Sequence, residues 1–158
     1  GLCPIDLEST GIQSPIINLL KLIKNLYGIE GKFYFDESLV MQDPNVASNL
    51  YYIAQEASFN AAKYSEGSLI IIKLYKQENY LVLSIEDNGK GIKRQRISED
   101  DNTGGMGLKI MKYRAEIIDG TIQIKNNNPS GTIITVKIPL ERITNDGRIL
   151  YEGNHAKQ

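Results

Sequence analysis

The order of strand-like and helix-like segments restricts the fold of this 158-residue chain more than any other feature of its sequence. Residues 68–87 hold two runs rich in β-branched and aromatic side chains, joined by the three-residue turn Gln77-Glu-Asn79. Residues 121–138 hold a second pair of runs around Asn126-Asn-Asn-Pro-Ser-Gly131. Each pair predicts a β-hairpin, and residues 32–35 predict one further short strand.

Apolar residues at a spacing of three and four predict helices over 11–28, from 43 to about 64, and from about 106 to 118. Ser14 is the expected N-cap of the first helix, Pro15 fits its first turn and Gly28 fits its C-cap. Asp43, followed by proline, is the expected start of the second helix. Gly120 is the expected C-cap of the third.

Two adjacent hairpins interleaved with helices favour an α+β fold, with a mixed, mostly antiparallel sheet and helices on one face. We expect a two-layer α/β sandwich over residues 11–140, followed by a C-terminal tail over 141–158. The chain is long enough for one such domain and too short for two of ordinary size.

Composition excludes several classes of protein. Cys3 is the only cysteine, so an intramolecular disulfide and a cysteine-based zinc site are excluded. No apolar run approaches the ~20 residues that cross a bilayer. The net charge of -1 gives no electrostatic reason to expect nucleic acid or direct contact with an anionic membrane. A reducing cytoplasmic setting is therefore expected for this domain.

The second predicted helix carries a carboxylate and a carboxamide, Glu56 and Asn60, one turn apart on the same face. The Asn60 oxygen could complete a Mg²⁺ shell made otherwise by water and triphosphate oxygens. Glu56 could orient or deprotonate an attacking group. Lys63 and Tyr64 follow within a turn, where an ammonium could meet phosphate and a ring could border a base. Alternatively, all four are ordinary polar or half-buried positions of an amphipathic helix.

Two glycine-containing segments follow. Asp87 ends an apolar strand and precedes Gly89 and Gly91, so the backbone can approach a flat ligand while the carboxylate accepts a hydrogen bond from an amine. The alternative is a purely structural turn. Residues 92–103 are polar and aperiodic, which fits a lid over a nucleotide better than a tight hairpin. Gly104, Gly105 and Gly107 precede a helix, where free amides can cradle phosphate.

Four motifs together resemble a known family: Gln55-Glu-Ala-x-x-Asn-Ala-x-Lys63, Asp87-Asn-Gly-x-Gly-Ile92, Gly105-Met-Gly-Leu-x-x-Met111 with Arg114-Ala115 after it, and Gly131-Thr-x-x-x-Val-x-Ile-Pro139. The chain is similar in these motifs to the catalytic, ATP-binding domain of sensor histidine kinases. Within that family it resembles the NarX, DesK and NreB group of the gyrase, chaperone, histidine kinase and MutL ATPases. The resemblance implies the Bergerat-type ATP-binding fold.

The same resemblance implies roles for individual residues. Glu56 and Lys63 would be catalytic, Asn60 would be the Mg²⁺ ligand, and Asp87 would read the adenine amine. The residues that would contact ATP are Asn60, Tyr64, Asp87, Gly89, Gly91, Ile92, Gly105, Met106, Gly107, Leu108 and Thr132. ATP and Mg²⁺ are the implied cofactors.

The family phosphorylates a histidine, yet the only histidine here is His155, in the predicted tail. The resemblance therefore implies an acceptor on a dimerisation domain of the same protein, with residues 1–10 as the segment that follows it. We expect no autophosphorylation by this chain alone. A homodimeric parent, possible membrane anchoring of that parent, and a response regulator as partner are also implied. Two alternatives remain open, a serine kinase of the anti-sigma-factor type and a non-catalytic ATP-binding module.

Overall fold

The computed structural model describes residues 11–39, 43–92 and 105–141. Their elements are α2 (Gln13–Tyr27), β1 (Glu30–Phe35), α3 (Pro44–Tyr64), β2 (Leu69–Gln77), β3 (Tyr80–Asp87), α4 (Met106–Ile117), β4 (Thr121–Asn126) and β5 (Thr132–Pro139). This order of helices and strands agrees with the order predicted from sequence. The predicted linker over 1–10, most of the predicted lid, Gly104 and nearly all of the predicted tail lie outside the described residues.

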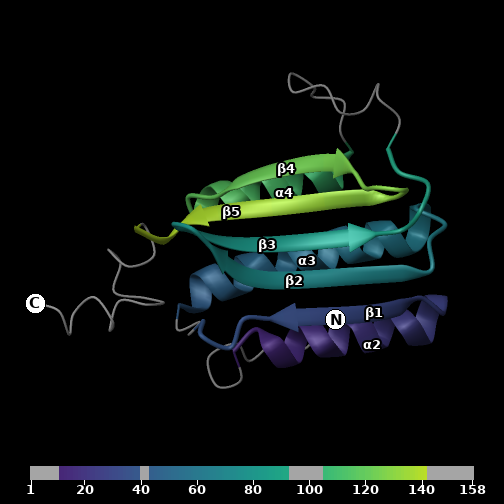
Figure 1. Ribbon diagram of the computed structural model, residues 1–158, viewed down its shortest axis with the longest axis horizontal. Helices are drawn as coiled ribbons and strands as arrows, with labels where there is room; N and C mark the ends of the chain where they lie inside the picture. The colour runs from purple at the N-terminus through teal and green to yellow at the C-terminus, as the bar shows by residue number, and fades with distance from the viewer. Residues whose placement is uncertain (1–10, 40–42, 93–104, 142–158) are drawn as a thin grey trace, which may run out of the picture.

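The described strands form a five-stranded sheet in the order β1-β2-β3-β5-β4. β1 pairs with β2 in parallel, and the other neighbouring strands pair antiparallel. The three labelled helices lie on one face of this sheet, with α2 beside β1 and α4 beside β4 and β5 (Figure 1). The predicted two-layer α+β sandwich is confirmed.

Strand alternation places one row of side chains under the helices. Ile70, Ile72 and Leu74 of β2 are buried, and they pair across the sheet with Asp87, Ile85 and Leu83 of β3. Side chains of directly paired residues lie on the same face of a sheet. Asp87 therefore ends a row of core residues that faces the helical layer. Its neighbour Glu86 belongs to the opposite face.

Helix starts agree only in part with the prediction. Asp43 caps α3, because its carboxylate accepts hydrogen bonds from the backbone of Asn45 and Val46. The prediction of Ser14 as the cap of α2 is wrong, since Ile12 holds that position without a side-chain hydrogen bond. Ile12 is 1% exposed, so burial of its side chain in the core favours a start two residues earlier than the hydroxyl cap. Gly28 ends α2 with φ 71°, as predicted.

Two further turn predictions are wrong. Gln77 pairs with Tyr80, so the hairpin loop contains two residues, Glu78 and Asn79, rather than three. The C-cap of α4 is Ile118 rather than Gly120, and Asp119 takes the left-handed conformation with φ 58°. The glycine signal misplaced the end of the helix, because Asp119 occupies the left-handed position that glycine usually takes. No helix within the described ranges has the length and apolar character to span a bilayer.

Candidate functional site

Gly107 brings the second glycine segment onto α3 beside the acid and the amide. A Cβ atom at Gly107 would collide with Glu56 Oε1 and would lie 3.1 Å from Asn60 Nδ2. Only a residue without a side chain allows this approach at the first turn of α4. The predicted acid–amide pair and the predicted phosphate loop are therefore in direct contact.

Asp87 is a buried carboxylate with two backbone donors. It is 9% exposed, and its Oδ1 accepts hydrogen bonds from Gly89 N at 2.9 Å and from Thr132 N at 3.3 Å. Burial raises the pKa of the Asp87 carboxyl above its ordinary value, and these two hydrogen bonds oppose that shift only in part. Both bonds use Oδ1, and within the described residues Oδ2 accepts none.

The turn after Asp87 packs on the end of α3. A Cβ at Gly89 would overlap the Ser65 carbonyl oxygen, and Lys90 N donates to that oxygen at 2.8 Å. Ser65 is the C-cap of α3, about 7 Å beyond Asn60 along the helix axis. The acid–amide pair, the Asp87 turn and the Gly107 segment thus meet on the last three turns of one helix.

Asn126 fixes the far end of the same turn. Its Oδ1 accepts a hydrogen bond from Ile92 N at 2.8 Å, and a Cβ at Gly91 would lie only 2.7 Å from that oxygen. Gly91 also has φ +77°, which disfavours any other residue. Gly131, on the loop before β5, has φ +105° and packs against the Asp87 carbonyl oxygen.

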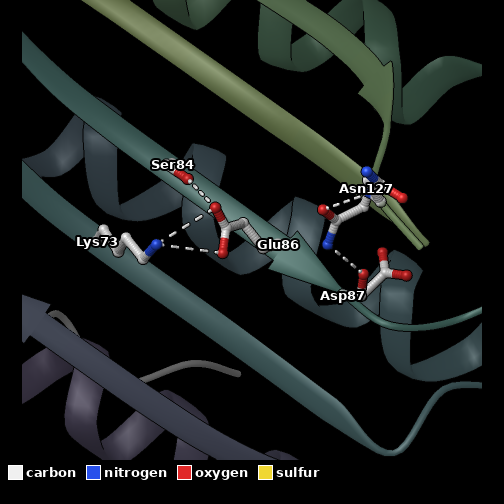
Figure 2. A network of polar contacts seen from close by, with 6 residues as sticks. Lys73, Ser84, Glu86, Asp87 and Asn127 are labelled. Carbon is white, nitrogen blue, oxygen red and sulfur yellow. Dashed lines mark hydrogen bonds and ion pairs between the residues drawn. The ribbon is translucent and has the colours of Figure 1, made fainter. Parts of the chain in front are cut away.

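The loop between β4 and β5 makes contacts that the sequence analysis did not anticipate. Figure 2 shows Asn127 Nδ2 reaching the backbone oxygen of Asp87, at 3.1 Å. Ser130 Oγ donates to the Asn88 backbone oxygen at 3.3 Å. Three asparagines and a serine in one loop were a signal for side-chain to backbone hydrogen bonds. Their partners lie about 40 residues earlier in the chain, so a local sequence signal cannot indicate which backbone groups they bind.

The other face of β3 carries a separate ion pair. Figure 2 shows Glu86 beside Lys73 and Ser84, with Lys73 Nζ 3.4 Å from Glu86 Oε2. The strand alternation separates Glu86 from Asp87, because successive side chains point to opposite faces. The neighbouring carboxylates therefore do not share one site.

Other predicted site residues are more exposed. The Lys63 ammonium lies 5.8 Å from the centroid of the Phe59 ring. Tyr64 is 66% exposed and Met106 is 73% exposed. Gly105 is exposed at the N-cap of α4, and its carbonyl accepts a hydrogen bond from Leu108 N at 3.1 Å. No described contact holds Lys63, Tyr64 or Met106 against the acid–amide pair.

An α+β sandwich with glycine turns on both sides of an acid–amide helix defines a class of nucleotide-binding domain. The chain belongs to the family of histidine kinase-, DNA gyrase B- and HSP90-like ATPases, which matches residues 45–142. It is 31% identical over 139 residues to the oxygen sensor histidine kinase NreB of Staphylococcus carnosus, covering 88% of this chain and 39% of that protein. It is 37% identical over 97 residues to the kinase/phosphatase DegS of Bacillus subtilis, covering 61% and 25%.

Solved structures share the fold. The histidine kinase domain of the blue-light activated kinase EL346 of Erythrobacter litoralis superposes with a TM-score of 0.69 at 17% identity, covering 90% of this chain and 67% of that one. The mycobacterial sensor histidine kinase MprB superposes with a TM-score of 0.59 at 22% identity, covering 80% and 93%. The chain spans about two fifths or less of its curated relatives NreB and DegS. It contains the ATP-binding catalytic domain of the sensor histidine kinase type.

Proposed function

We propose that this domain transfers the γ-phosphoryl group of ATP to a histidine on a dimerisation domain outside the chain. The observation that carries the proposal is the meeting of Glu56, Asn60, Gly107 and the Asp87 turn on the end of α3. The relatives NreB and DegS are named as histidine kinases, which supports the same reaction here. A parent homodimer, with a cognate response regulator as the next acceptor, belongs to this proposal.

The base-binding end of the proposed site centres on Asp87. Its Oδ1 is occupied by two backbone donors, so Oδ2 is the atom assigned to the exocyclic amine of adenine. Gly89, Gly91 and Ile92 would border the base, and Thr132 N keeps the carboxylate in place. Tyr64, on the last turn of α3, would cover an edge of the base.

The phosphate end of the proposed site lies at the start of α4. Backbone amides of Gly105, Met106, Gly107 and Leu108 would bind phosphate oxygens, with the N-terminus of the helix favouring negative charge. Within the described residues no three His, Cys, Asp or Glu side chains are grouped to hold a metal. An amide oxygen such as that of Asn60 is a ligand type that Mg²⁺ accepts beside phosphate oxygens and water, and this ion would neutralise charge on the transferred group.

Two charged side chains on α3 would take part in the transfer. Glu56 faces the start of α4, where it would orient the acceptor imidazole or take up its proton. Lys63 has a long exposed side chain on the same helix, and its ammonium would move from the Phe59 ring to a phosphate. Catalysis would then rest on positioning and on charge stabilisation.

The decisive experiment measures binding of a fluorescent ATP analogue with Mg²⁺, and phosphotransfer to a supplied dimerisation domain from the parent kinase. Asp87→Asn should lose nucleotide binding, because the carboxamide can present a donor toward the adenine amine. Glu56→Gln should keep binding and lose phosphotransfer by about 10²-fold or more. Normal binding by Asp87→Asn, or normal transfer by Glu56→Gln, would contradict these assignments.

The two alternatives predict different products. A serine kinase would leave phosphate on its target after acid treatment, whereas phosphohistidine is labile to acid. A non-catalytic binding module would bind the analogue and label no acceptor at all. Acid-labile label on the dimerisation domain, with none on this chain alone, is the result expected here.

A stripe of exposed apolar residues on α4 supports a contact with that dimerisation domain. Met106, Ile110, Tyr113 and Ile117 recur at spacings of four, three and four, and they are 73%, 39%, 65% and 42% exposed. Such a spacing puts all four on one helical face. Because this face begins at the proposed phosphate loop, we assign it to the partner that brings the acceptor histidine.

A further inference from the structure

Arg114, near the end of α4, joins that helix to α3 through two contacts. Its guanidinium carbon lies 4.4 Å from the centroid of the Tyr52 ring, and its NH1 donates to Asn49 Oδ1 at 3.3 Å. A guanidinium group stacked on an aromatic face gains attraction from the ring electrons. The proposed function assigns no role to Arg114.

The Asn49 end of this contact is rigid. Asn49 is 4% exposed, and its Nδ2 donates to the Asn45 backbone oxygen at 2.8 Å. Because the amide is buried and bound on its other side, it presents Oδ1 to Arg114 in a fixed direction. Tyr52 and Asn49 lie one turn apart on α3, so Arg114 contacts the same face of α3 that carries Glu56 and Asn60.

The spacing along both helices agrees. On α4, the two contact points Gly107 and Arg114 are about 10 Å apart along the helix axis. On α3, the midpoint of Glu56 and Asn60 is about 11 Å from the midpoint of Asn49 and Tyr52. The two helices run in opposite directions at this contact, since later residues of α4 meet earlier residues of α3. One α4–α3 register therefore satisfies both the Gly107 contact and the Arg114 contact.

A shift of α4 along α3 would break these contacts together. Among the described residues no hydrogen bond joins Gly107 to α3, so this contact alone does not resist sliding. The Arg114 contact is directional, since a planar guanidinium must meet both a ring face and an amide oxygen. The orienting part of the helix pair thus lies about two turns away from the phosphate loop that it orients.

We propose that Arg114 is a positioning residue that sets the register of α4 on α3 and so holds the Gly105–Leu108 turn in place for the phosphates of ATP. This inference rests on the proposed ATP binding. Without the contact, a smaller fraction of molecules would have the loop in the binding register, and the apparent affinity would fall by that fraction. Affinity for a ligand that lacks phosphates would not change.

The test compares Mg·ATP with adenosine, each titrated against the 158-residue chain in competition with a fluorescent ATP analogue. Arg114→Ala should weaken Mg·ATP about five-fold and leave adenosine unchanged. Arg114→Lys keeps a cation near Tyr52 without the planar fork, so its loss should be smaller. Tyr52→Leu removes the ring contact and leaves the hydrogen bond to Asn49, so it should reproduce part of the selective loss, and Tyr52→Phe should behave as wild type.

Lys112→Ala is the matched control, because it removes one positive charge from α4 at a position about 200° around the helix from Arg114. It should bind both ligands as wild type does. In the double variant Arg114→Ala/Tyr52→Leu, Mg·ATP affinity should fall no further than in Arg114→Ala alone, since Arg114→Ala already removes the contact with Tyr52.

Three outcomes would overturn the inference: unchanged Mg·ATP affinity in Arg114→Ala, an equal loss for adenosine and Mg·ATP, or the same loss in Lys112→Ala. If Arg114→Ala fails to fold, Tyr52→Leu and Arg114→Lys decide by the same comparison. A wild-type chain that does not bind Mg·ATP would instead contradict the proposed function itself, so the two failures are distinguishable.

Discussion

Asp87, the residue proposed to read the adenine amine, is a partly satisfied carboxylate in a buried position. Its carboxyl is buried at the end of a core-facing row, where ionisation is costly because water is largely excluded. Two backbone donors stabilise the charge, yet burial dominates and the pKa is raised. An unpaired carboxylate lone pair in such a position increases the benefit of a ligand that donates a hydrogen bond to it.

The raised pKa predicts how stability depends on pH. Below about pH 3.8, the ordinary carboxyl value, Asp87 is protonated in both folded and unfolded chains. As pH rises through the window up to the raised pKa, the unfolded chain loses its proton first, so this group lowers the free energy of unfolding. Asp87→Asn keeps an oxygen that accepts hydrogen bonds from Gly89 N and Thr132 N, and it removes the pH-dependent loss of stability because the carboxamide does not ionise.

We therefore expect the stability difference between Asp87→Asn and wild type to grow in favour of the variant as pH rises through that window. Urea unfolding at a series of pH values measures it. Because both proteins share every other titrating group, the difference isolates Asp87. Parallel stability curves would contradict the burial argument.

Ser58 differs from Asp87 because it is a buried polar residue whose side chain makes no hydrogen bond to any described residue. It is fully buried on α3, and its hydroxyl has no hydrogen-bond partner among the described residues. Ser58→Ala removes the unpaired hydroxyl and improves helix propensity, so we expect stabilisation of about 1 kcal/mol. Thermal unfolding of the two proteins tests this, and a destabilised variant would indicate that the hydroxyl has a partner.

At the scale of elements, periodicity predicted the helices and strands well, and local chemistry predicted their ends less well. The two hairpins follow from runs of β-branched residues between polar turns. The start of α2 does not follow from its hydroxyl, because the burial of Ile12 outweighs a cap at Ser14. Tertiary packing of this kind cannot be read from a local cap signal.

The end of α4 offers a direct test at this scale. Asp119 has φ 58°, Gly120 N donates to the Ala115 oxygen at 2.8 Å, and Asp119 N donates to the Glu116 oxygen at 3.0 Å. This is a Schellman arrangement with aspartate where glycine is usual. Asp119→Gly relieves the left-handed strain and removes an acid from a helix C-terminus, so we expect about 0.5–1 kcal/mol of stabilisation.

Chemical denaturation measures this gain, and Asp119→Ala is the matched control. Alanine removes the same charge but tolerates the left-handed conformation less well than aspartate, so it should gain less stability than glycine. Equal effects of the two substitutions would assign the gain to charge alone.

At the scale of the whole molecule, the sequence indicated which residues are candidates for the site, but it did not indicate which residues support them. Glu56, Asn60, Asp87 and Gly107 stand out because an acid, an amide and glycine turns have few common uses in that order. Asn126, Asn127, Ser130 and Ser65 did not stand out. They act on backbone groups of distant segments, and only the folded sheet brings those segments together.

The proposed site is built from segments that are distant in the sequence, which predicts strong coupling of ligand binding to folding. Mg·ATP at one hundred times its dissociation constant should add about 2.7 kcal/mol to the free energy of unfolding. The unfolding midpoint should therefore rise by several degrees. Addition of EDTA should reverse most of the rise, because EDTA removes the Mg²⁺ ion and the neutral amide of Asn60 cannot offset the charge of the triphosphate. A midpoint that ATP does not move would argue against a shared site.

The Asp87 turn also affects the rate at which Asn88 deamidates. Asn88-Gly89 is a dipeptide that deamidates readily in unfolded chains, when the glycine nitrogen attacks the asparagine side-chain carbonyl. Here Gly89 N donates to Asp87, and the Asn88 carboxamide oxygen accepts hydrogen bonds from Ser68 N and Leu69 N. Nucleophile and target are both held in place, so the folded chain should resist this damage. Mass spectrometry after prolonged storage, folded against urea-unfolded, would reveal whether the turn that positions the carboxylate also preserves it.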